Sequence, residues 1–256
     1  MDKWFDIGID GLRLDVADEL SDDFIEKIRI AVKRNKVDGF IMGEVWKNPM
    51  RMGRGYISSG KCMDTVMNYP LIDALLRYYK YADCNKLDYI IRDILREYPE
   101  ETINSLMNFT STHDISRAIN YFTDENEFNE YAEWAWDLKN NDLNYLKNKK
   151  LSKEEYEKAK EKYKSYLFAL YFLPGNVSVF YGDEVGVDGY GNLLNRKTYP
   201  WGMEDKDLLE YFKKLGKDRN NELFLETAGL KLRDINSDYF SYERIGPKDK
   251  MLVITN

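Results

Sequence analysis

The sequence predicts an α/β fold in which a parallel sheet is followed by antiparallel strands. Between residues 9 and 220, short apolar runs of strand length alternate with longer stretches whose apolar residues recur at helical spacing. This alternation is typical of parallel strands joined by crossover helices. From residue 229 the helical pattern stops, and three short runs separated by turn residues predict antiparallel strands.

The first predicted unit, a strand followed by a helix, lies between residues 8 and 35. Apolar residues alternate with other residues over 9–16, which is typical of a strand. Ser21 is a suitable N-cap, two aspartates follow it, and apolar residues at helical spacing continue as far as Asn35. The run GFIMGEVW, over 39–46, then predicts a second strand.

Further strands and helices are predicted in the same alternating order. A weaker third strand, 65–69, precedes two helices, and a polar stretch containing Trp134 and Trp136 predicts a surface insertion. Ser152 and Glu155 form a capping box that opens a long helix, which Pro174 and Gly175 end. The remaining predicted ranges are helices over 71–81, 87–98 and 207–220, strands over 106–110 and 177–181, the insertion over 124–150, and terminal strands over 229–234, 239–245 and 251–255.

Composition restricts the function classes. The net charge is −7 and no basic cluster is interleaved with aromatics, which argues against nucleic acid or an anionic membrane surface as a partner. No apolar run has the length of about 18 residues that a membrane helix needs. The single histidine excludes a multi-histidine metal site, and the two cysteines have neither zinc-site nor disulfide-scaffold spacing. His113 is also the one possible base for a Ser-His-Asp triad, so carboxylates are considered first as catalytic groups.

Three acids follow predicted strands: Asp15, Glu44 and Asp114. Side chains at the carboxyl ends of parallel barrel strands line the active site, so these acids should converge there. Arg13 and Asp15 equally fit an ion pair that only closes a strand. The chain has no GxGxxG, P-loop or HExxH motif. Convergent carboxylates without metal ligands suit glycoside hydrolysis, in which one carboxylate attacks and another acid protonates the leaving oxygen.

Four segments resemble the α-amylase family of retaining glycoside hydrolases, in the family's order along the chain. They are GLRLDVADE, IMGEVW, TSTHDISR and PGNVSVFYGDE, which resemble the motifs of barrel strands four, five, seven and eight. Within the family, DVADEL, DTVMNYP and NRKTYPWG look like the neopullulanase, cyclomaltodextrinase and amylopullulanase group. One departure is Ser116, where relatives commonly carry proline or valine.

The resemblance implies a role for each residue that matches a motif. Asp15 would be the nucleophile, Glu44 the acid and base, and Asp114 the third catalytic acid. Arg13, His113 and Arg117 would bind substrate with them. Two further residues are expected near the substrate, although packing roles suit both equally or better: Trp46, as a stacking surface on the leaving-group side, and Arg196, in the loop after the fifth strand.

The resemblance also implies the architecture: a partial (β/α)8 TIM barrel, about strands four to eight, followed by the first strands of an antiparallel β-domain. Residues 1–224 would form the C-terminal part of the barrel, and 225–256 would begin the β-domain. The family's first motif and the domain inserted after strand three are absent. No cofactor is required by the residues present; calcium would bind, if at all, through regions missing here.

The expected activity is hydrolysis of α-1,4 bonds in α-glucans, with α-1,6 bonds left open, by double displacement. Two alternatives stay open: a transglycosylase using the same residues, and a non-catalytic glucan-binding remnant. The partner would be an α-glucan, with no nucleic acid and no membrane. Open barrel edges would expose unpaired strands, so we expect residues 1–256 alone to be inactive and to self-associate or be unstable.

Overall fold

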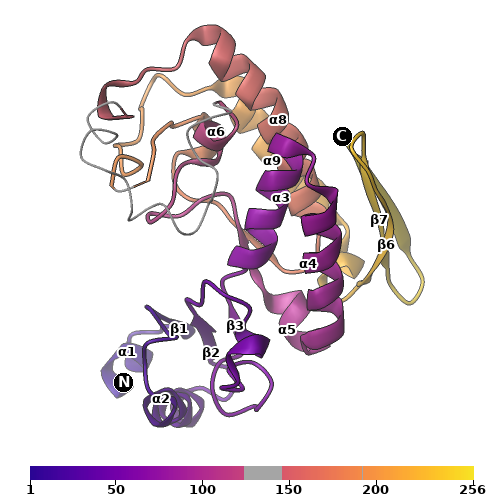
Figure 1. Cartoon of the computed structure of the whole chain (residues 1–256). Coiled ribbons are helices and arrows are strands. Elements are labelled where there is room, and N and C mark those ends of the chain that lie inside the picture. Colours follow the sequence, from indigo (N-terminus) through magenta and orange to yellow (C-terminus); the bar gives the residue numbers. More distant parts are fainter. Residues whose placement is uncertain (124–145, 192) are drawn as a thin grey trace.

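The computed structural model describes residues 1–123, 146–191 and 193–256, so most of the predicted insertion, 124–145, lies outside the described residues (Figure 1). Helices and strands alternate from the N-terminus, and the last three strands follow one another directly. The helices are α1 Asp2–Asp6, α2 Asp22–Asn35, α3 Tyr69–Tyr81, α4 Cys84–Glu97, α5 Glu100–Ser105, α6 Ala118–Tyr121, α8 Lys153–Phe172 and α9 Lys206–Asn221, with 3₁₀ turns at Pro49–Met52, Asp183–Val185 and Leu223–Glu226. The strands are β1 Gly11–Leu14, β2 Phe40–Gly43, β3 Thr65–Val66, β4 Met107–Phe109, β5 Asn176–Ser178, β6 Gly229–Ile235, β7 Phe240–Ile245 and β8 Lys250–Thr255.

Strands β1 to β5 are parallel and follow one another in chain order. β1 pairs with β2, β2 with β3, and β4 with β5. A parallel bridge between Met67 and Met107 joins the two groups, so the five strands form one row. Because parallel strands need crossover connections, helices separate most of them in the sequence. All five carboxyl ends therefore lie along one edge of this row.

The local signals that the sequence carries at helix ends are present in the structure. The Ser21 hydroxyl accepts a hydrogen bond from the Phe24 N–H and begins α2. Ser152 and Glu155 form the predicted capping box at the start of α8. After α8 the backbone turns at Gly175, which has φ +104°, and an added Cβ there would lie 2.6 Å from the Leu106 carbonyl oxygen. Only glycine suits both the conformation and this close approach.

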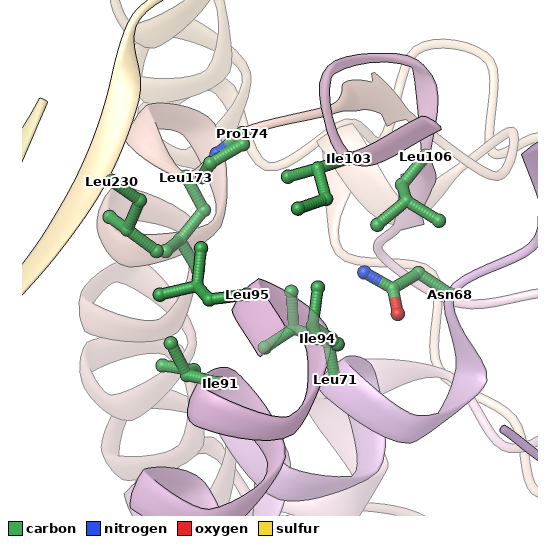
Figure 2. A pocket seen from close by; sticks show the side chains of 10 residues that line it. All are labelled: Asn68, Leu71, Ile91, Ile94, Leu95, Ile103, Leu106, Leu173, Pro174 and Leu230. Carbon is green, nitrogen blue, oxygen red and sulfur yellow. The ribbon is translucent and has the colours of Figure 1, made fainter. Parts of the chain in front are cut away.

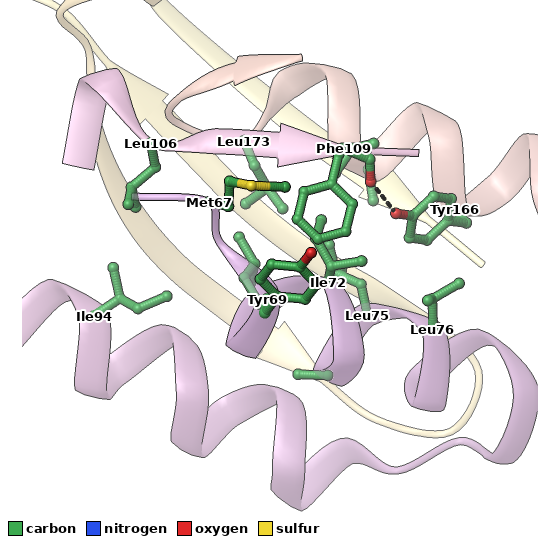
Figure 3. Packing of buried hydrophobic residues seen from close by; sticks show 14 of the residues in the cluster. Met67, Tyr69, Ile72, Leu75, Leu76, Ile94, Leu106, Phe109, Tyr166 and Leu173 are labelled. Carbon is green, nitrogen blue, oxygen red and sulfur yellow. Dashed lines mark hydrogen bonds between the residues drawn. The ribbon is translucent and has the colours of Figure 1, made fainter. Parts of the chain in front are cut away.

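The core lies between the strand row and helices α3, α4 and α8, which pack beside one another (Figure 1). Figure 3 shows Tyr69, Ile72, Leu75 and Leu76 of α3 facing Phe109 of β4. The Tyr69 and Phe109 rings meet edge to face with centroids 4.8 Å apart, and the Tyr166 hydroxyl donates to the Phe109 carbonyl at 2.9 Å. These contacts fix the distance between α8, α3 and the end of β4.

A small cavity remains where α4 and α5 meet the end of α8 (Figure 2). Its volume is about 20 Å³, which has room for a single water molecule. Asn68 provides the only polar side chain among its lining residues, and its amide group donates to Oδ1 of Asn108 at 2.8 Å. The cavity is otherwise apolar and lies inside the core, so we read it as a packing defect.

The antiparallel sheet β6-β7-β8 is joined to the helices by a shared core, in which Phe240, Tyr242 and Val253 belong to the same buried cluster as α3 and α8. Three side chains also bond the carbonyls at the end of α8. The Tyr242 hydroxyl donates to the Ala169 carbonyl at 2.9 Å, Arg244 donates to that of Phe172 at 2.8 Å, and Arg219 of α9 donates to those of Tyr171 and Leu173. The Ala169 carbonyl also accepts the Leu173 N–H, whereas the last carbonyls of a helix have no partner within it, so the bonds to Tyr171 and Phe172 complete the end of α8.

The order of the elements agrees with the sequence prediction, but all five parallel strands are shorter than predicted, and the structure explains the length of two of them. The predicted third strand, 65–69, ends at Val66, because Tyr69 and Pro70 already belong to the first turn of α3. The predicted fifth strand, 177–181, is observed as Asn176–Ser178, because the chain turns at Phe180, whose carbonyl accepts the Asp183 N–H. The short helices α1 and α5 have no counterpart in the prediction.

Candidate active site

The candidate site lies along the carboxyl ends of the five parallel strands. Asp15 follows β1, Glu44 follows β2, Tyr69 follows β3 after two residues, and Asp114 lies in the loop after β4. The pairing register places Leu14 opposite Gly43, so Asp15 and Glu44 leave the sheet at the same level. The strands alone therefore bring these side chains to one edge.

Arg13 connects the first two carboxylates. Its guanidinium forms an ion pair with Oδ1 of Asp15 through Nη1, and another with Oε2 of Glu44 through Nη2 at 2.9 Å. The two acids differ sharply in exposure: the Asp15 side chain is 72% exposed and that of Glu44 4%. One carboxylate is thus open to a ligand while the other is enclosed, and a single cation holds both.

The backbone immediately after Asp15 is strained. Val16 has φ +39°, a region that a β-branched residue rarely occupies. This turn directs the Val16 N–H at Oε2 of Glu44, with a distance of 2.9 Å. Backbone strain of this kind persists only where the surroundings enforce it, and it clusters at functional sites. Here it supplies Glu44 with a fixed donor.

Trp46 and Tyr69 enclose Glu44 from the other side. The Trp46 Nε1–H donates to Oε1 of Glu44 at 3.0 Å, and its ring stacks on Tyr69 with centroids 4.6 Å apart and planes 15° apart. One face of the indole is therefore covered by protein. Trp46 was expected to stack on substrate or to pack; its ring packs on Tyr69, and its N–H contacts an acid of the site.

The loop after β4 carries His113 and Asp114. His113 Nε2 lies 3.1 Å from Oδ2 of Asp114, and Arg196 Nη2 lies 3.3 Å from Oδ1. Arg196 also donates to the His113 carbonyl at 3.0 Å, so it binds both residues of this pair. Burial raises the pKa of Asp114; His113, Arg196 and Arg13 act against this, and the negative charge of Glu44 adds to it. Glu44 and Asp114 therefore lie close enough to interact.

Arg117 requires a correction, because the structure does not place it where a substrate could reach it. Its side chain is fully buried and forms an ion pair with Oδ1 of Asp183 at 2.8 Å. It also donates to the carbonyls of Tyr181 and Asn195. Arg117 fastens the loop after β4 to the segment after β5, so its contacts are internal and the expectation of direct substrate binding is wrong.

Two residues that were not predicted as site residues hold the same loop. Asn195 is fully buried, and its amide donates to the Thr112 carbonyl at 2.9 Å and to the Ile115 carbonyl at 2.5 Å, on either side of Asp114. Ser116, the departure from the usual proline or valine, accepts the Gly191 N–H at 2.8 Å. Nothing in the sequence indicated Asn195, because its partners lie about 80 residues away.

A hollow of about 190 Å³ lies beside the site, and its lining residues include Arg13, His113, Met42, Met67 and Met107. In the described ranges, no cluster of three or more His, Cys, Asp or Glu side chains has the arrangement of a metal site. Nor does any helix there have the length and apolarity that crossing a bilayer requires. The described site consists of carboxylates, arginines, one histidine and aromatic rings.

A row of parallel strands with paired carboxylates at its carboxyl edge is the arrangement expected of a β/α enzyme. Comparison with known proteins identifies the family. The family model described as "Alpha amylase, catalytic domain" matches residues 1–229. The chain belongs to the α-amylase family, a family of glycoside hydrolases.

Individual relatives agree with this assignment. An amylopullulanase of Thermoanaerobacter thermohydrosulfuricus is 30% identical over 254 residues, and a cyclomaltodextrinase of a Bacillus species is 29% identical over 255. These matches cover 93% and 97% of this chain but 15% and 39% of the relatives, so the chain spans well under half of their length. A solved cyclomaltodextrinase structure superposes with a TM-score of 0.78 at 27% identity, covering all of this chain and 38% of that one. The fold is therefore of the (β/α)8 barrel type, covered in part, with an antiparallel sheet after it.

Proposed function

We propose that this chain carries the catalytic centre of a retaining α-glucan hydrolase. The observation that supports this best is the pair of acids held by Arg13, one exposed and one enclosed. Retaining glycosidases use two carboxyl groups in different roles, one as nucleophile and one as acid and then base. Asp15 has the access that a nucleophile needs. Glu44 has the fixed position that a proton donor needs.

In the first step, an oxygen of Asp15 attacks the anomeric carbon, and the bond from that carbon to the glycosidic oxygen breaks. Glu44 gives its proton to the departing oxygen, which leaves as a sugar hydroxyl. In the second step, Glu44 takes a proton from water as the water oxygen attacks the anomeric carbon and Asp15 leaves as a carboxylate. Two inversions restore the original α configuration, and both acids return to their starting state.

The other charged side chains have roles that follow from their positions. Arg13 stabilises the Asp15 carboxylate that departs in the second step. Asp114, fixed by His113 and Arg196, would accept hydrogen bonds from sugar hydroxyls, and such bonds accelerate the reaction only if they strengthen as the ring distorts. The names of the relatives, amylopullulanase and cyclomaltodextrinase, support an α-glucan as the substrate class. The choice between α-1,4 and α-1,6 bonds depends on the cleft walls.

We further propose that β1 to β5 correspond to strands four to eight of the barrel, and that residues 1–256 form only part of the working site. In the described residues, β1 pairs with β2 alone and β5 with β4 alone, so each has an unpaired edge. The high exposure of Asp15 agrees with a site that lacks a wall on this side. On this proposal, residues 1–224 belong to the barrel and residues from 225 onward to the β-domain.

The test uses the complete gene product that carries residues 1–256, incubated with a linear maltooligosaccharide. NMR of the first product should show the α anomer before mutarotation. Asp15→Asn and Glu44→Gln should each lower kcat by at least about 10²-fold, since proton transfer alone contributes about 10²–10⁴-fold. Asp10→Asn is the matched control. Asp10 immediately precedes β1, at the end of the strand away from Asp15, and pairs with Lys36, so this variant should be as active as wild type.

An initial β product would contradict the proposal, and so would full turnover by Asp15→Asn protein whose mass excludes reversion to aspartate. The same experiment separates hydrolysis from transfer. If added maltose is extended rather than left unchanged, a sugar hydroxyl replaces water in the second step, and the enzyme is a transglycosylase with the same residues. If glucan binds but no variant or wild-type protein cleaves it, the chain is a binding remnant and the proposal fails.

A further inference from the structure

The two oxygens of Glu44 have unequal surroundings. Oε2 accepts the Val16 N–H at 2.9 Å and lies 2.9 Å from Nη2 of Arg13 in an ion pair. In the described part of the chain, Oε1 receives the Trp46 Nε1–H alone, at 3.0 Å. The positive charge of Arg13 beside Oε2 disfavours a proton on that oxygen, so Oε1 is the oxygen that can carry a proton.

The position of Oε1 therefore depends on Trp46, which is itself held by Tyr69. The Tyr69 ring is buried, stacks on the indole at 4.6 Å and meets Phe109 edge to face at 4.8 Å. Tyr69 lies in the first turn of α3, where Pro70 fixes the backbone. A chain of rings thus runs from β4 through Tyr69 and Trp46 to one oxygen of Glu44.

The Tyr69 hydroxyl is a buried polar group beside the two acids Glu44 and Asp114. It is buried without a hydrogen-bond partner of normal geometry, although the Thr112 hydroxyl lies beside it. Burial raises the Tyr69 pKa, and the charges of Glu44 and Asp114 raise it further, so the hydroxyl stays neutral near both acids. Buried polar groups without partners are rare and require an explanation.

We propose that Trp46, held in place by Tyr69, is a positioning residue that aims Oε1 of Glu44 at the leaving oxygen. This inference rests on the proposed function, because it assumes that Glu44 is the proton donor. It assigns the indole N–H, rather than the ring face, as the functional part of Trp46. A ring that served only as a stacking surface for the departing sugar would affect binding of every substrate with an aromatic or sugar leaving group alike.

The test compares phenyl α-maltoside with 4-nitrophenyl α-maltoside in the complete gene product. The two aglycones have similar shapes, but phenolate is a poor leaving group that needs a proton, whereas 4-nitrophenolate needs one much less. Trp46→Phe keeps an aromatic ring and removes the N–H. It should lower kcat/KM for the phenyl substrate by about 10–100-fold, since misplacing a catalytic group by about 1 Å can cost about 10²-fold. The loss for the 4-nitrophenyl substrate should be several times smaller.

Three further variants make the result interpretable. Glu44→Gln should show the same dependence on the leaving group, more strongly. Tyr69→Leu, which removes the stacking ring, should show it more weakly. Trp4→Phe is the control: Trp4 is 60% exposed on α1, away from the strand ends, and both rates should stay unchanged. Near-UV circular dichroism checks that each variant retains its tertiary structure.

A second measurement does not depend on Trp46→Phe folding. Residues 1–256 contain five tryptophans, and each indole N–H gives a signal in ¹H–¹⁵N spectra of the complete gene product. Glu44→Gln should move one indole signal strongly and leave the others in place. If no indole signal moves, or if Trp46→Phe lowers both rates equally while Glu44→Gln discriminates between them, the inference is overturned and the proposed function stands. If Glu44→Gln itself does not discriminate, Glu44 is not the proton donor and the proposed function fails.

Discussion

The buried ion pair between Arg117 and Asp183 gives the sharpest prediction for stability. Neither side chain reaches solvent: Arg117 is fully buried and Asp183 is 2% exposed. Oδ1 of Asp183 binds Arg117 at 2.8 Å, and Oδ2 accepts the hydroxyls of Thr110 and Ser111 at 2.6 and 2.5 Å. Every oxygen of this carboxylate thus has a protein partner, and its charge has one counter-charge.

Asp183→Asn tests that counter-charge with minimal change of shape. The asparagine can still accept from Arg117 and can donate to the two hydroxyl oxygens, so the loss isolates the charge. Removing one partner of a buried pair leaves an uncompensated buried charge, which costs about 3–5 kcal/mol. Arg117→Met should cost a similar amount, because the Tyr181 and Asn195 carbonyls also lose their donors. The double variant should lose less than the sum, by about 1–3 kcal/mol.

The assay is urea unfolding of the complete gene product, followed by far-UV circular dichroism and by tryptophan fluorescence. Coincidence of the two signals justifies a two-state free energy. Single variants within about 1 kcal/mol of wild type would refute the argument, and so would strictly additive losses in the double variant. Either result would mean that water reaches the Arg117–Asp183 ion pair, or that the surrounding dipoles already stabilise each charge.

Three other predictions follow from contacts described above. Asn195→Ala leaves the Thr112 and Ile115 carbonyls without this donor and should lower the free energy of unfolding by about 1–3 kcal/mol for each carbonyl. Urea unfolding measures the loss, and unchanged stability would show that Asn195 does not hold the loop. Ion pairs with Arg233 and Lys250 lower the pKa of Glu243 to about 2, so wild type should lose stability as pH falls from about 4.5 to about 2. In the Glu243→Gln variant the unfolding temperature should depend less on pH over that range. The same pH dependence in variant and wild type would contradict this. Residues 1–256 expressed alone should neither cleave soluble glucan nor sediment as a stable monomer. An active monomer would refute the proposal that the unpaired edges of β1 and β5 prevent residues 1–256 from working alone.

Much of the fold could be predicted because its determinants are local. Strand and helix order follows from the spacing of apolar residues, and Ser21 and Ser152 mark two helix starts by their own side-chain chemistry. Strand lengths were less predictable. Residues 65–69 have strand composition, but Pro70 fixes the backbone for a helix, and the helix extends back to Tyr69.

The candidate site was predictable where residues follow strands and unpredictable where loops meet. The placement of Asp15, Glu44 and Asp114 at one edge could be predicted because parallel strands bring their carboxyl ends together. The interpretation of Arg117 was wrong because burial depends on Asp183, 66 residues further along the chain. Asn195 was missed for the same reason. Such contacts are fixed only when the loops after β4 and β5 are packed against each other, and no local pattern encodes them.

The capped end of α8 has a consequence for synthesis of the protein. Arg219 and Arg244, which bond the Tyr171 and Phe172 carbonyls, are made 48 and 72 residues after them. At about 5–20 residues per second, the second interval lasts about 4–14 s. During that time the growing chain has a helix with an unfinished end, beside a core surface that Phe240 and Tyr242 will later cover. The C-terminal sheet thus completes a helix that was synthesised well before it, and the ribosome-bound intermediate exposes an apolar surface at which a chaperone could bind.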